Sequence, residues 1–313
     1  MSGSCSPARS DPRMATRLPL PAIVFTLFAS TSWAAEFPAT AAPGAKPAVV
    51  YQDDRYFEGP SWDPRTQRLY FTAFGKTTQI LRLDAPGKVT VWLDRTAGVN
   101  GTYLANDGRL LGAQVNGHRV LSYAIGPNGP RDTRVLYRNP GLNQPNDVCQ
   151  APNGDIYFSD PDFATLKKSA VYLLRPSGDA VKVITDMALP NGLKTSLDGK
   201  TLYVSDSYQK VWRSYPIHAD GTLEKGALFF NPDVSDRSDP DGMSIDAEGN
   251  LYCTGRGGVW VVRADGRSLG LIPFPDFCSN VTFGGADGKT LFVTGSKKVS
   301  ALQMTVRGGQ FKR

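Results

Sequence analysis

Residues 144–158 read QPNDVCQAPNGDIYF, and this stretch contains every part of a unit that recurs along the chain. A polar motif opens the unit, a Pro-Asn-Gly turn follows, and a strand rich in aromatic and branched residues closes it. Glycine accepts a positive φ without steric cost, so Asn-Gly and Asp-Gly turns are strong signals of a β-hairpin. The unit therefore predicts a hairpin whose first strand begins at the polar motif.

Six such motifs occur, and each places one Glu, Asn or Asp at the same point of its unit. They are Phe57-Glu58-Gly59-Pro60, Val99-Asn100-Gly101, Gln144-Pro145-Asn146-Asp147, Leu189-Pro190-Asn191-Gly192, Asp239-Pro240-Asp241-Gly242 and Cys278-Ser279-Asn280. From Glu58 to Asn100 is 42 residues, and the next intervals are 46, 45, 50 and 39. A period of roughly 40–50 residues, with several short strands in each repeat, is typical of a β-propeller. We therefore predict an all-β fold, a six-bladed β-propeller that forms a single domain.

The propeller is predicted over residues 48–306. Its first segment, residues 48–51, is expected to pair with the last blade near residues 299–306, because an unclosed ring would leave a frayed edge. Residues 35–47 are rich in Ala and Pro and are predicted to be a disordered lead-in. Residues 307–313 are predicted to be a basic, solvated tail.

Residues 1–34 are typical of a secretory signal peptide. Arg17 precedes an apolar run from Leu18 to Phe28, and Ser32-Trp33-Ala34 supplies small residues at the −3 and −1 positions. A membrane anchor is the alternative, but the apolar run is too short to span a bilayer. We therefore expect cleavage after Ala34 and export of the mature protein, either to a periplasm or to the medium.

The composition indicates a folded, turn-rich chain without a strongly charged surface. Of 313 residues, 41% are hydrophobic and 20% are charged, which favours a packed core over disorder. The net charge is +6, but the basic residues are scattered, whereas a nucleic-acid surface needs a patch or a stripe. We therefore expect no nucleic-acid partner, no membrane span in the mature chain, and a monomer.

The cysteines indicate neither a redox motif nor a cysteine-based zinc site. Cys5 lies in the predicted signal, which leaves Cys149, Cys253 and Cys278 in the mature chain, with no CxxC spacing and no Cys/His cluster. Whether two of these three form a disulfide stays open at this point.

The six polar motifs also predict a metal site. Equivalent points of the blades converge around the axis of a propeller, so the polar side chains of the motifs would face one another. Carboxylate and amide oxygens without Cys or His favour Ca²⁺ or Mg²⁺ over softer metals. Pro-Asn-Gly and Pro-Asp-Gly are also ordinary turn sequences, so the prediction depends on the common phase of all six motifs. Asn100 and Asn280 share this phase and are expected to line the same pocket.

Five of these stretches resemble a known family in their order and spacing. Glu58-Gly59-Pro60, Pro145-Asn146-Asp147, Tyr157-Phe158-Ser159-Asp160-Pro161, Pro190-Asn191-Gly192 and Pro240-Asp241-Gly242-Met243 stand in the order seen in the regucalcin, gluconolactonase and luciferin-regenerating-enzyme family. The resemblance runs from about Tyr56 to about Met304. The closing stretch, residues 249–285, is similar to the bacterial gluconolactonase branch.

The resemblance implies a six-bladed propeller with one divalent metal on its axis, usually Ca²⁺, with Mg²⁺ or Zn²⁺ as alternatives. The family's ligands correspond to Glu58, Asn191 and Asp241, with Asn146 as a fourth ligand or a contact to substrate. Asn100 and Gln144 are further candidates for contacts to substrate. Gln144 stands where the regucalcin branch has an arginine, which puts that branch's substrate preference in doubt here.

The function that these features favour is hydrolysis of a sugar lactone to its aldonic acid by an exported, metal-dependent lactonase. Asp241 is the candidate catalytic residue, either as the base that activates water or as a nucleophile that attacks the substrate directly. Two alternatives stay open. One is a metal-dependent phosphotriesterase that uses the same site, and the other is a binding propeller without activity in which calcium only stabilises the axis.

Overall fold

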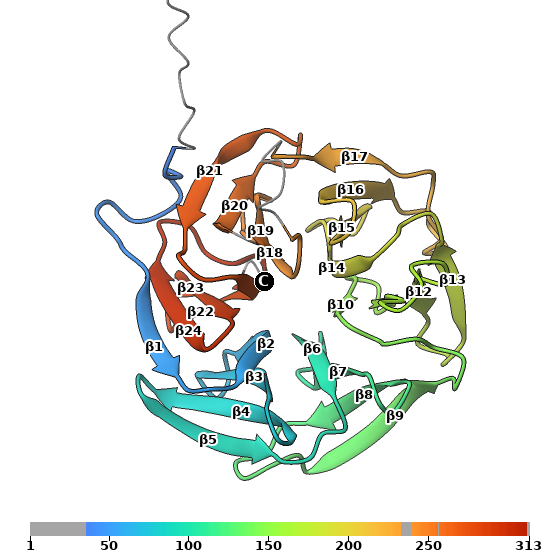
Figure 1. Cartoon of the computed structure of the whole chain (residues 1–313), viewed down its shortest axis with the longest axis horizontal. Coiled ribbons are helices and arrows are strands. Elements are labelled where there is room, and N and C mark those ends of the chain that lie inside the picture. Colours follow the sequence, from blue (N-terminus) through green and yellow to red (C-terminus); the bar gives the residue numbers. More distant parts are fainter. Residues whose placement is uncertain (1–35, 233–238, 256, 312–313) are drawn as a thin grey trace, which may run out of the picture. The chain divides into compact units, whose positions relative to one another are not determined.

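The computed structural model describes residues 36–232, 239–255 and 257–311, which form six antiparallel sheets arranged around one axis (Figure 1). Each sheet has four strands and forms one blade. The predicted six-bladed β-propeller is therefore confirmed. The predicted signal peptide, residues 1–34, lies outside the described residues.

The strands of each blade follow one another outward from the axis. The innermost strands are β2 (Tyr56–Asp63), β6 (Val99–Leu104), β10 (Val148–Gln150), β14 (Pro190–Thr195), β18 (Met243–Ile245) and β22 (Cys278–Gly284). The second strands are β3 (Arg68–Phe74), β7 (Leu110–Gln114), β11 (Ile156–Asp160), β15 (Thr201–Asp206), β19 (Leu251–Gly255) and β23 (Thr290–Gly295). The third strands are β4 (Thr78–Ala85), β8 (Arg119–Ala124), β12 (Ala170–Leu174), β16 (Val211–Pro216), β20 (Gly258–Val262) and β24 (Lys298–Gln303). The outermost strands are β5 (Lys88–Leu93), β9 (Asp132–Arg138), β13 (Ala180–Ile184), β17 (Ala227–Phe230), β21 (Ser268–Pro273) and β1 (Ala48–Gln52).

The hydrophobic core lies between the faces of neighbouring blades. Every residue of β11 and β12 is buried, whereas the outermost strand of that blade, β13, exposes Val181 and Lys182. Large aromatic side chains fill the space between blades. Trp62 of the first blade stacks on Phe292 of the last, with ring centroids 5.6 Å apart. The ring is thus held together by sheet-to-sheet packing at each boundary.

The chain closes the ring as the sequence predicts. β1 pairs antiparallel with β24, with Ala48 opposite Ala301 and Gln52 opposite Lys298. The last blade is therefore built from β22, β23 and β24 near the end of the chain and from β1 near its start. This pairing covers the strand edge that an open ring would expose.

The segments on either side of the propeller differ from the prediction. Residues 36–47, predicted as a disordered lead-in, lie against the last two blades: the Leu271 amide donates to the Glu36 carbonyl (3.0 Å), and Ala41, buried, forms a bridge with Met304. Residues 307–311 are not a solvated tail, because Gly308 bridges to Asp246 and the chain then forms a short 3₁₀ helix, η1 (Gly309–Phe311). Small and aromatic side chains packed on the blades order both segments.

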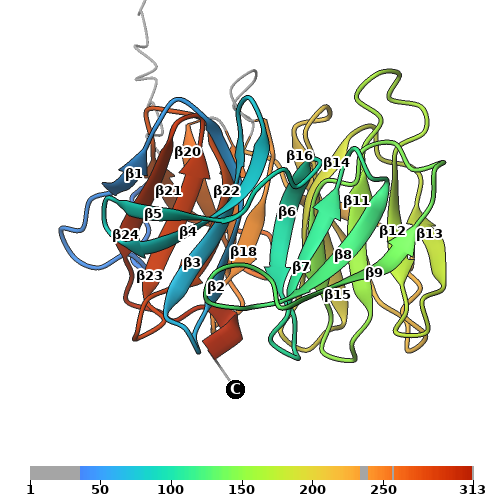
Figure 2. The same cartoon turned by 90° about the horizontal axis from the view of Figure 1, so that it is seen from below.

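The innermost strands define two ends of the axis. Each begins near a polar motif and ends at the opposite end of the ring, where η1 also lies (Figure 2).

In the described ranges, no helix has the length and apolar character needed to cross a membrane. Cys149, Cys253 and Cys278 are buried free thiols, so none of them forms a disulfide with another.

Candidate metal centre on the propeller axis

The six motif residues lie at the same end of the axis because they occupy equivalent positions in their blades. Glu58 and Asn280 are third in β2 and β22, Asn100 and Asn191 are second in β6 and β14, and Asn146 and Asp241 stand two residues before β10 and β18. All except the half-buried Asn100 are buried.

Backbone contacts between neighbouring blades explain why glycine follows several of these residues. The Gly101 amide donates to the Asn146 carbonyl of the next blade (2.7 Å), and the Gly242 amide donates to the Ser279 carbonyl (2.8 Å). A Cβ at Gly101 would overlap the Asn146 carbonyl and the Asp147 side chain. At these points glycine follows the axial residue because the next blade passes too close for a side chain.

Hydroxyl groups on the second strands fix the axial segments in place. Thr72 donates to the Asn100 carbonyl (2.8 Å), Ser205 to the Asp241 carbonyl (2.9 Å) and Thr254 to the Ser279 carbonyl (3.0 Å). In each case the donor belongs to one blade and the acceptor to the next. Sequence reasoning missed these residues, although each stands two residues after a tyrosine of the second strand, as in Tyr70-Phe71-Thr72.

Three buried carboxylates lie close enough to affect one another's ionisation. Burial, and then the charge of Asp147, raise the pKa of Glu58 to about 8. Burial raises the pKa of Asp147 to about 6, and burial followed by the charges of Glu58 and Asp147 raises the pKa of Asp241 well above its ordinary value. Like charges in a low-dielectric site disfavour ionisation of one another, so a cation would be stabilised among them. Asp147 was not among the predicted site residues.

Hydrogen bonds separate the axial asparagines into two groups. Both ends of the Asn280 amide are hydrogen-bonded: its nitrogen donates to Glu58 Oε2 (3.0 Å) and to both Asp147 oxygens (3.1 and 3.0 Å), and its oxygen accepts from the Val281 amide (2.8 Å). Asn280 therefore ties two carboxylates together, and its oxygen already accepts one hydrogen bond.

Asn191 has the opposite arrangement. Its amide nitrogen donates to Ser207 Oγ (3.1 Å), and Ser207 in turn donates to the Pro240 carbonyl (2.5 Å). These two hydrogen bonds fix the orientation of the Asn191 amide. The Oδ1 atom of Asn191 is buried without a hydrogen-bond partner among the described residues. The Oδ1 atom of Asn100 is buried and unpartnered in the same way. A buried amide oxygen without a donor is costly unless something else binds it.

The side chains of the two remaining predicted residues, Asn146 and Gln144, form no hydrogen bond with the other axial residues in the described part of the chain. The side chain of Asn146 is buried and makes no hydrogen bond within the described part of the chain. The backbone amide of Gln144 donates to Asp160 Oδ1 (2.8 Å), which anchors the segment before the motif. No hydrogen bond links the Gln144 side chain to the axial residues within that part of the chain, so its contact with substrate stays a prediction.

The residues present fit a hard divalent cation. No three His, Cys, Asp or Glu side chains of the described ranges are grouped so that they could hold an ion by themselves, so amide oxygens would have to complete any ligand set. The unpartnered Oδ1 atoms of Asn100 and Asn191 supply such oxygens beside mutually repelling carboxylates. Oxygen donors of this kind suit Ca²⁺ and, in a smaller cage, Mg²⁺.

Comparison with known proteins identifies the family. Residues 57–297 match the family model described as the SMP-30/gluconolactonase/LRE-like region. The chain is 28% identical to a gluconolactonase of Zymomonas mobilis over 80% of this chain and 79% of that one, and 26% identical to the pentonolactonase XacC of Haloferax volcanii over 79% and 83%. The solved structure of a gluconolactonase from Xanthomonas campestris superposes with a TM-score of 0.74 at 28% identity, covering 85% of this chain and 92% of that one.

Proposed function

The chain belongs to the SMP-30/gluconolactonase/LRE-like family, and from this premise we propose that it hydrolyses a sugar lactone to the corresponding aldonic acid with the help of a divalent metal. The observation that carries the proposal is the axial group of Glu58, Asn191 and Asp241, in which carboxylates repel one another beside an unpartnered amide oxygen. The names of the two relatives, a gluconolactonase and a pentonolactonase, support a sugar lactone as the substrate class.

Glu58, Asn191 and Asp241 would hold the metal, with Asn146 or Asn100 as a further oxygen ligand. Bound there, a divalent cation supplies Lewis-acid chemistry, which polarises an ester carbonyl and stabilises the negative charge that develops on its oxygen. Ca²⁺ is the proposed ion because the donors are all oxygens.

Asp241 would act on the proton of the attacking water. One carboxylate oxygen takes a proton as the water oxygen bonds to the carbonyl carbon. The bond from that carbon to the ring oxygen then breaks, and Asp241 returns the proton to the departing ring oxygen. The product is one open-chain hydroxy acid, so atoms and charge balance. Burial and the charges of Glu58 and Asp147 raise the pKa of Asp241 in the metal-free site, and a bound cation would favour the ionised form that accepts the proton.

The amides of Asn100 and Asn146 would orient the sugar by hydrogen bonds to its hydroxyl groups. A site that pairs hydroxyls discriminates against analogues that lack them, because its buried polar groups are then left without partners. We therefore propose that small polyhydroxy lactones react faster than long-chain acyl lactones or bulky phosphotriesters.

A pH-stat assay tests the substrate class by comparing gluconolactone, a long-chain acyl lactone and a phosphotriester, each with and without chelator. We expect the highest chelator-sensitive kcat/KM with gluconolactone. If the phosphotriester has the highest value, the phosphotriesterase alternative holds instead. If none reacts above its spontaneous rate, the lactonase proposal is wrong and the binding-propeller alternative is favoured.

Calorimetric Ca²⁺ titration of Asp241→Asn and Glu58→Gln tests the metal ligands. Each substitution replaces a carboxylate by a neutral group of similar shape, so both variants should lose Ca²⁺ binding, and kcat/KM for gluconolactone should fall by about a hundredfold or more. Glu224→Gln, which removes an exposed carboxylate in another part of the chain, is the matched control and should behave as wild type. Wild-type Ca²⁺ affinity in both axial variants would overturn the assignment.

A further inference from the structure

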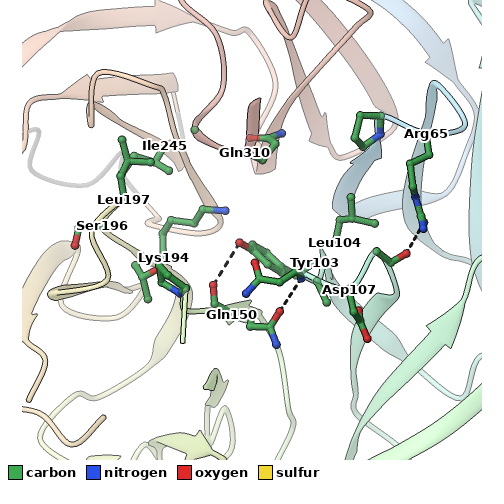
Figure 3. A pocket seen from close by; sticks show the side chains of 17 residues that line it. Arg65, Tyr103, Leu104, Asp107, Gln150, Lys194, Ser196, Leu197, Ile245 and Gln310 are labelled. Carbon is green, nitrogen blue, oxygen red and sulfur yellow. Dashed lines mark hydrogen bonds between the residues drawn. The ribbon is translucent and has the colours of Figure 1, made fainter. Parts of the chain in front are cut away.

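A cavity of about 420 Å³ opens at the end of the axis opposite the metal centre (Figure 3). Its walls come from the ends of the innermost strands and the turns that follow them, among them Tyr103 of β6, Gln150 of β10, Lys194 of β14 and Ile245 of β18. Gln310 of η1 completes the wall. Its volume is within the range of small-molecule sites in proteins, roughly 300–1,000 Å³.

Lys194 brings to this cavity a positive charge that forms no ion pair within the described residues. Its ammonium nitrogen lies 4.4 Å from the centroid of the Tyr103 ring, and Figure 3 shows the side chain reaching into the space beside Tyr103 and Gln310. No carboxylate in the described ranges forms an ion pair with it, and no acceptor there forms a hydrogen bond with it. Burial lowers the pKa of Lys194, so an anion bound at its nitrogen would offset part of the cost of its charge.

The other charged side chains that line the cavity do not pair with Lys194. Arg65 is committed to Asp63 (3.0 Å) and to the Gly108 carbonyl (2.5 Å). Asp107 is exposed, and its Oδ1 accepts from the Arg109 amide (3.0 Å). Asp147, whose charge acts on Lys194, does not line this cavity; it lines a smaller one of about 50 Å³ that shares Lys194 and Gln310 with it.

The remaining walls suit the body of an organic molecule. Leu197 and Ile245 present apolar surface. The side-chain amides are already held in place, since Gln310 donates to the Phe283 carbonyl (2.7 Å) and Gln150 accepts from the Asn106 amide (2.8 Å). The site is thus preformed, with one cation and a partly apolar wall.

We infer that this cavity binds a small organic carboxylate, with the carboxylate at the Lys194 ammonium and the body against Leu197 and Ile245. The contact would be a charge-assisted hydrogen bond, with the Tyr103 ring supporting the cation from the other side. The inference does not depend on the lactonase proposal, because none of the groups that form this site belongs to the proposed metal centre.

Isothermal titration calorimetry with benzoate and with gluconate tests this site, one probe with an apolar body and one with a polyhydroxy body. The titrations use the full-length protein as it is purified, stripped of metal, in wild-type and Asp241→Asn forms, so that binding at the metal centre does not contribute. Saturable binding of either probe to both forms supports the site, and the better probe shows which body the wall accepts. Binding of neither probe overturns it.

Lys194→Met removes the charge at nearly constant length, and Lys194→Arg keeps it. Loss of a charge-assisted hydrogen bond should weaken binding by about ten- to a hundredfold in Lys194→Met, while Lys194→Arg should keep most of the affinity. Lys200→Met, at an exposed lysine of the following turn, is the matched control and should bind as wild type. Thermal unfolding establishes that each variant is folded. Wild-type affinity in folded Lys194→Met, or loss of affinity in Lys200→Met equal to that in Lys194→Met, contradicts the inference.

Discussion

Asn280 and Asn191 carry the same amide group at equivalent points of two blades, yet their hydrogen bonds give them different roles. Asn280 donates to Glu58 and Asp147 and so reduces the repulsion between two buried carboxylates. Asn191 is oriented by Ser207, with its oxygen left unpartnered among the described residues. Motif position alone could not distinguish the two, because the distinction depends on partners from other blades.

Asn280→Ala should therefore destabilise the metal-free protein more than the calcium-loaded one. Without the amide, two buried carboxylates lose a donor, and the free energy of unfolding should fall by roughly 2 kcal/mol in metal-free conditions. Bound Ca²⁺ would offset the repulsion, so the loss should be smaller with calcium. Urea unfolding with and without Ca²⁺ measures both values.

Asn250→Ala provides the control for that experiment. Asn250 is also buried, but its amide donates to Asp246 Oδ2 (2.9 Å) in the turn after β18, away from the motif residues. Its effect on stability should be the same with and without Ca²⁺. If Asn280→Ala is equally insensitive to calcium, Asn280 does not act by holding the axial carboxylates.

At the scale of the strand and the blade, local sequence patterns predicted the structure within a blade, but they did not predict the contacts between neighbouring blades. The hairpins, the six repeats and the closing strand follow from turn residues and from alternating strands, which are local patterns. Asn146 and Asp147 show where this approach fails. The repeat marks the pair, but period alone cannot tell which of two adjacent polar residues interacts with the other axial side chains.

The lead-in shows the same limit. Residues 36–47 have a composition that predicts disorder, yet their backbone bonds to β21 and β24 lie more than two hundred residues away in sequence. Thr72, Ser205 and Thr254 were overlooked for a related reason, since each donates to a carbonyl of the next blade. Contacts between distant segments leave little trace in the composition of either segment.

The glycine of the motif gives a test at this scale. A Cβ at Gly192 would overlap the Asp241 carbonyl oxygen of the next blade, so Gly192→Ala must displace the backbone that carries Asp241. We expect a loss of about 2–3 kcal/mol in the free energy of unfolding, together with weaker Ca²⁺ binding. Urea unfolding and calorimetric titration measure the two effects.

Gly249→Ala separates backbone strain from displacement of the site. Gly249 has a φ of +87°, but apart from its own chain neighbours no described residue comes within 4 Å of the place that a methyl group would occupy. The substitution therefore strains only its own turn. It should lower stability while leaving Ca²⁺ affinity unchanged. Unchanged Ca²⁺ affinity in Gly192→Ala as well would show that contact between the blades does not position Asp241.

At the scale of the whole molecule, we propose that the protein is exported. The basis is Arg17, the apolar run from Leu18 to Phe28 and the small residues Ser32 and Ala34. The mature chain should begin near Ala35 and be recovered outside the cytoplasm. N-terminal sequencing of protein from a periplasmic fraction checks this, and an N-terminus at Met1 or Met14 would contradict it.

The axial carboxylates also link the stability of the whole molecule to pH. The pKa of Glu58 rises from 4.5 to about 8, and that of Asp147 from 3.8 to about 6. A carboxyl group whose pKa is raised on folding binds more protons in the folded state than in the unfolded state. Its contribution to stability is therefore fully present below the unfolded pKa and is lost as pH rises through the folded pKa.

The metal-free protein should accordingly lose stability between about pH 4.5 and pH 8, the reverse of the trend for carboxylates in ion pairs. Bound Ca²⁺ would favour the ionised forms, so the stability gained from calcium should grow over the same interval, and calcium binding near pH 7 should release protons. Thermal unfolding across this range, with metal-stripped and calcium-saturated protein, measures the difference. Glu58→Gln removes the group with the higher of the two pKa values, so it should make the metal-free profile less steep above about pH 6, where Asp241, whose pKa is also raised, still contributes. A metal-free profile that rises with pH would mean that these carboxylates are paired in the folded protein rather than held apart for a cation.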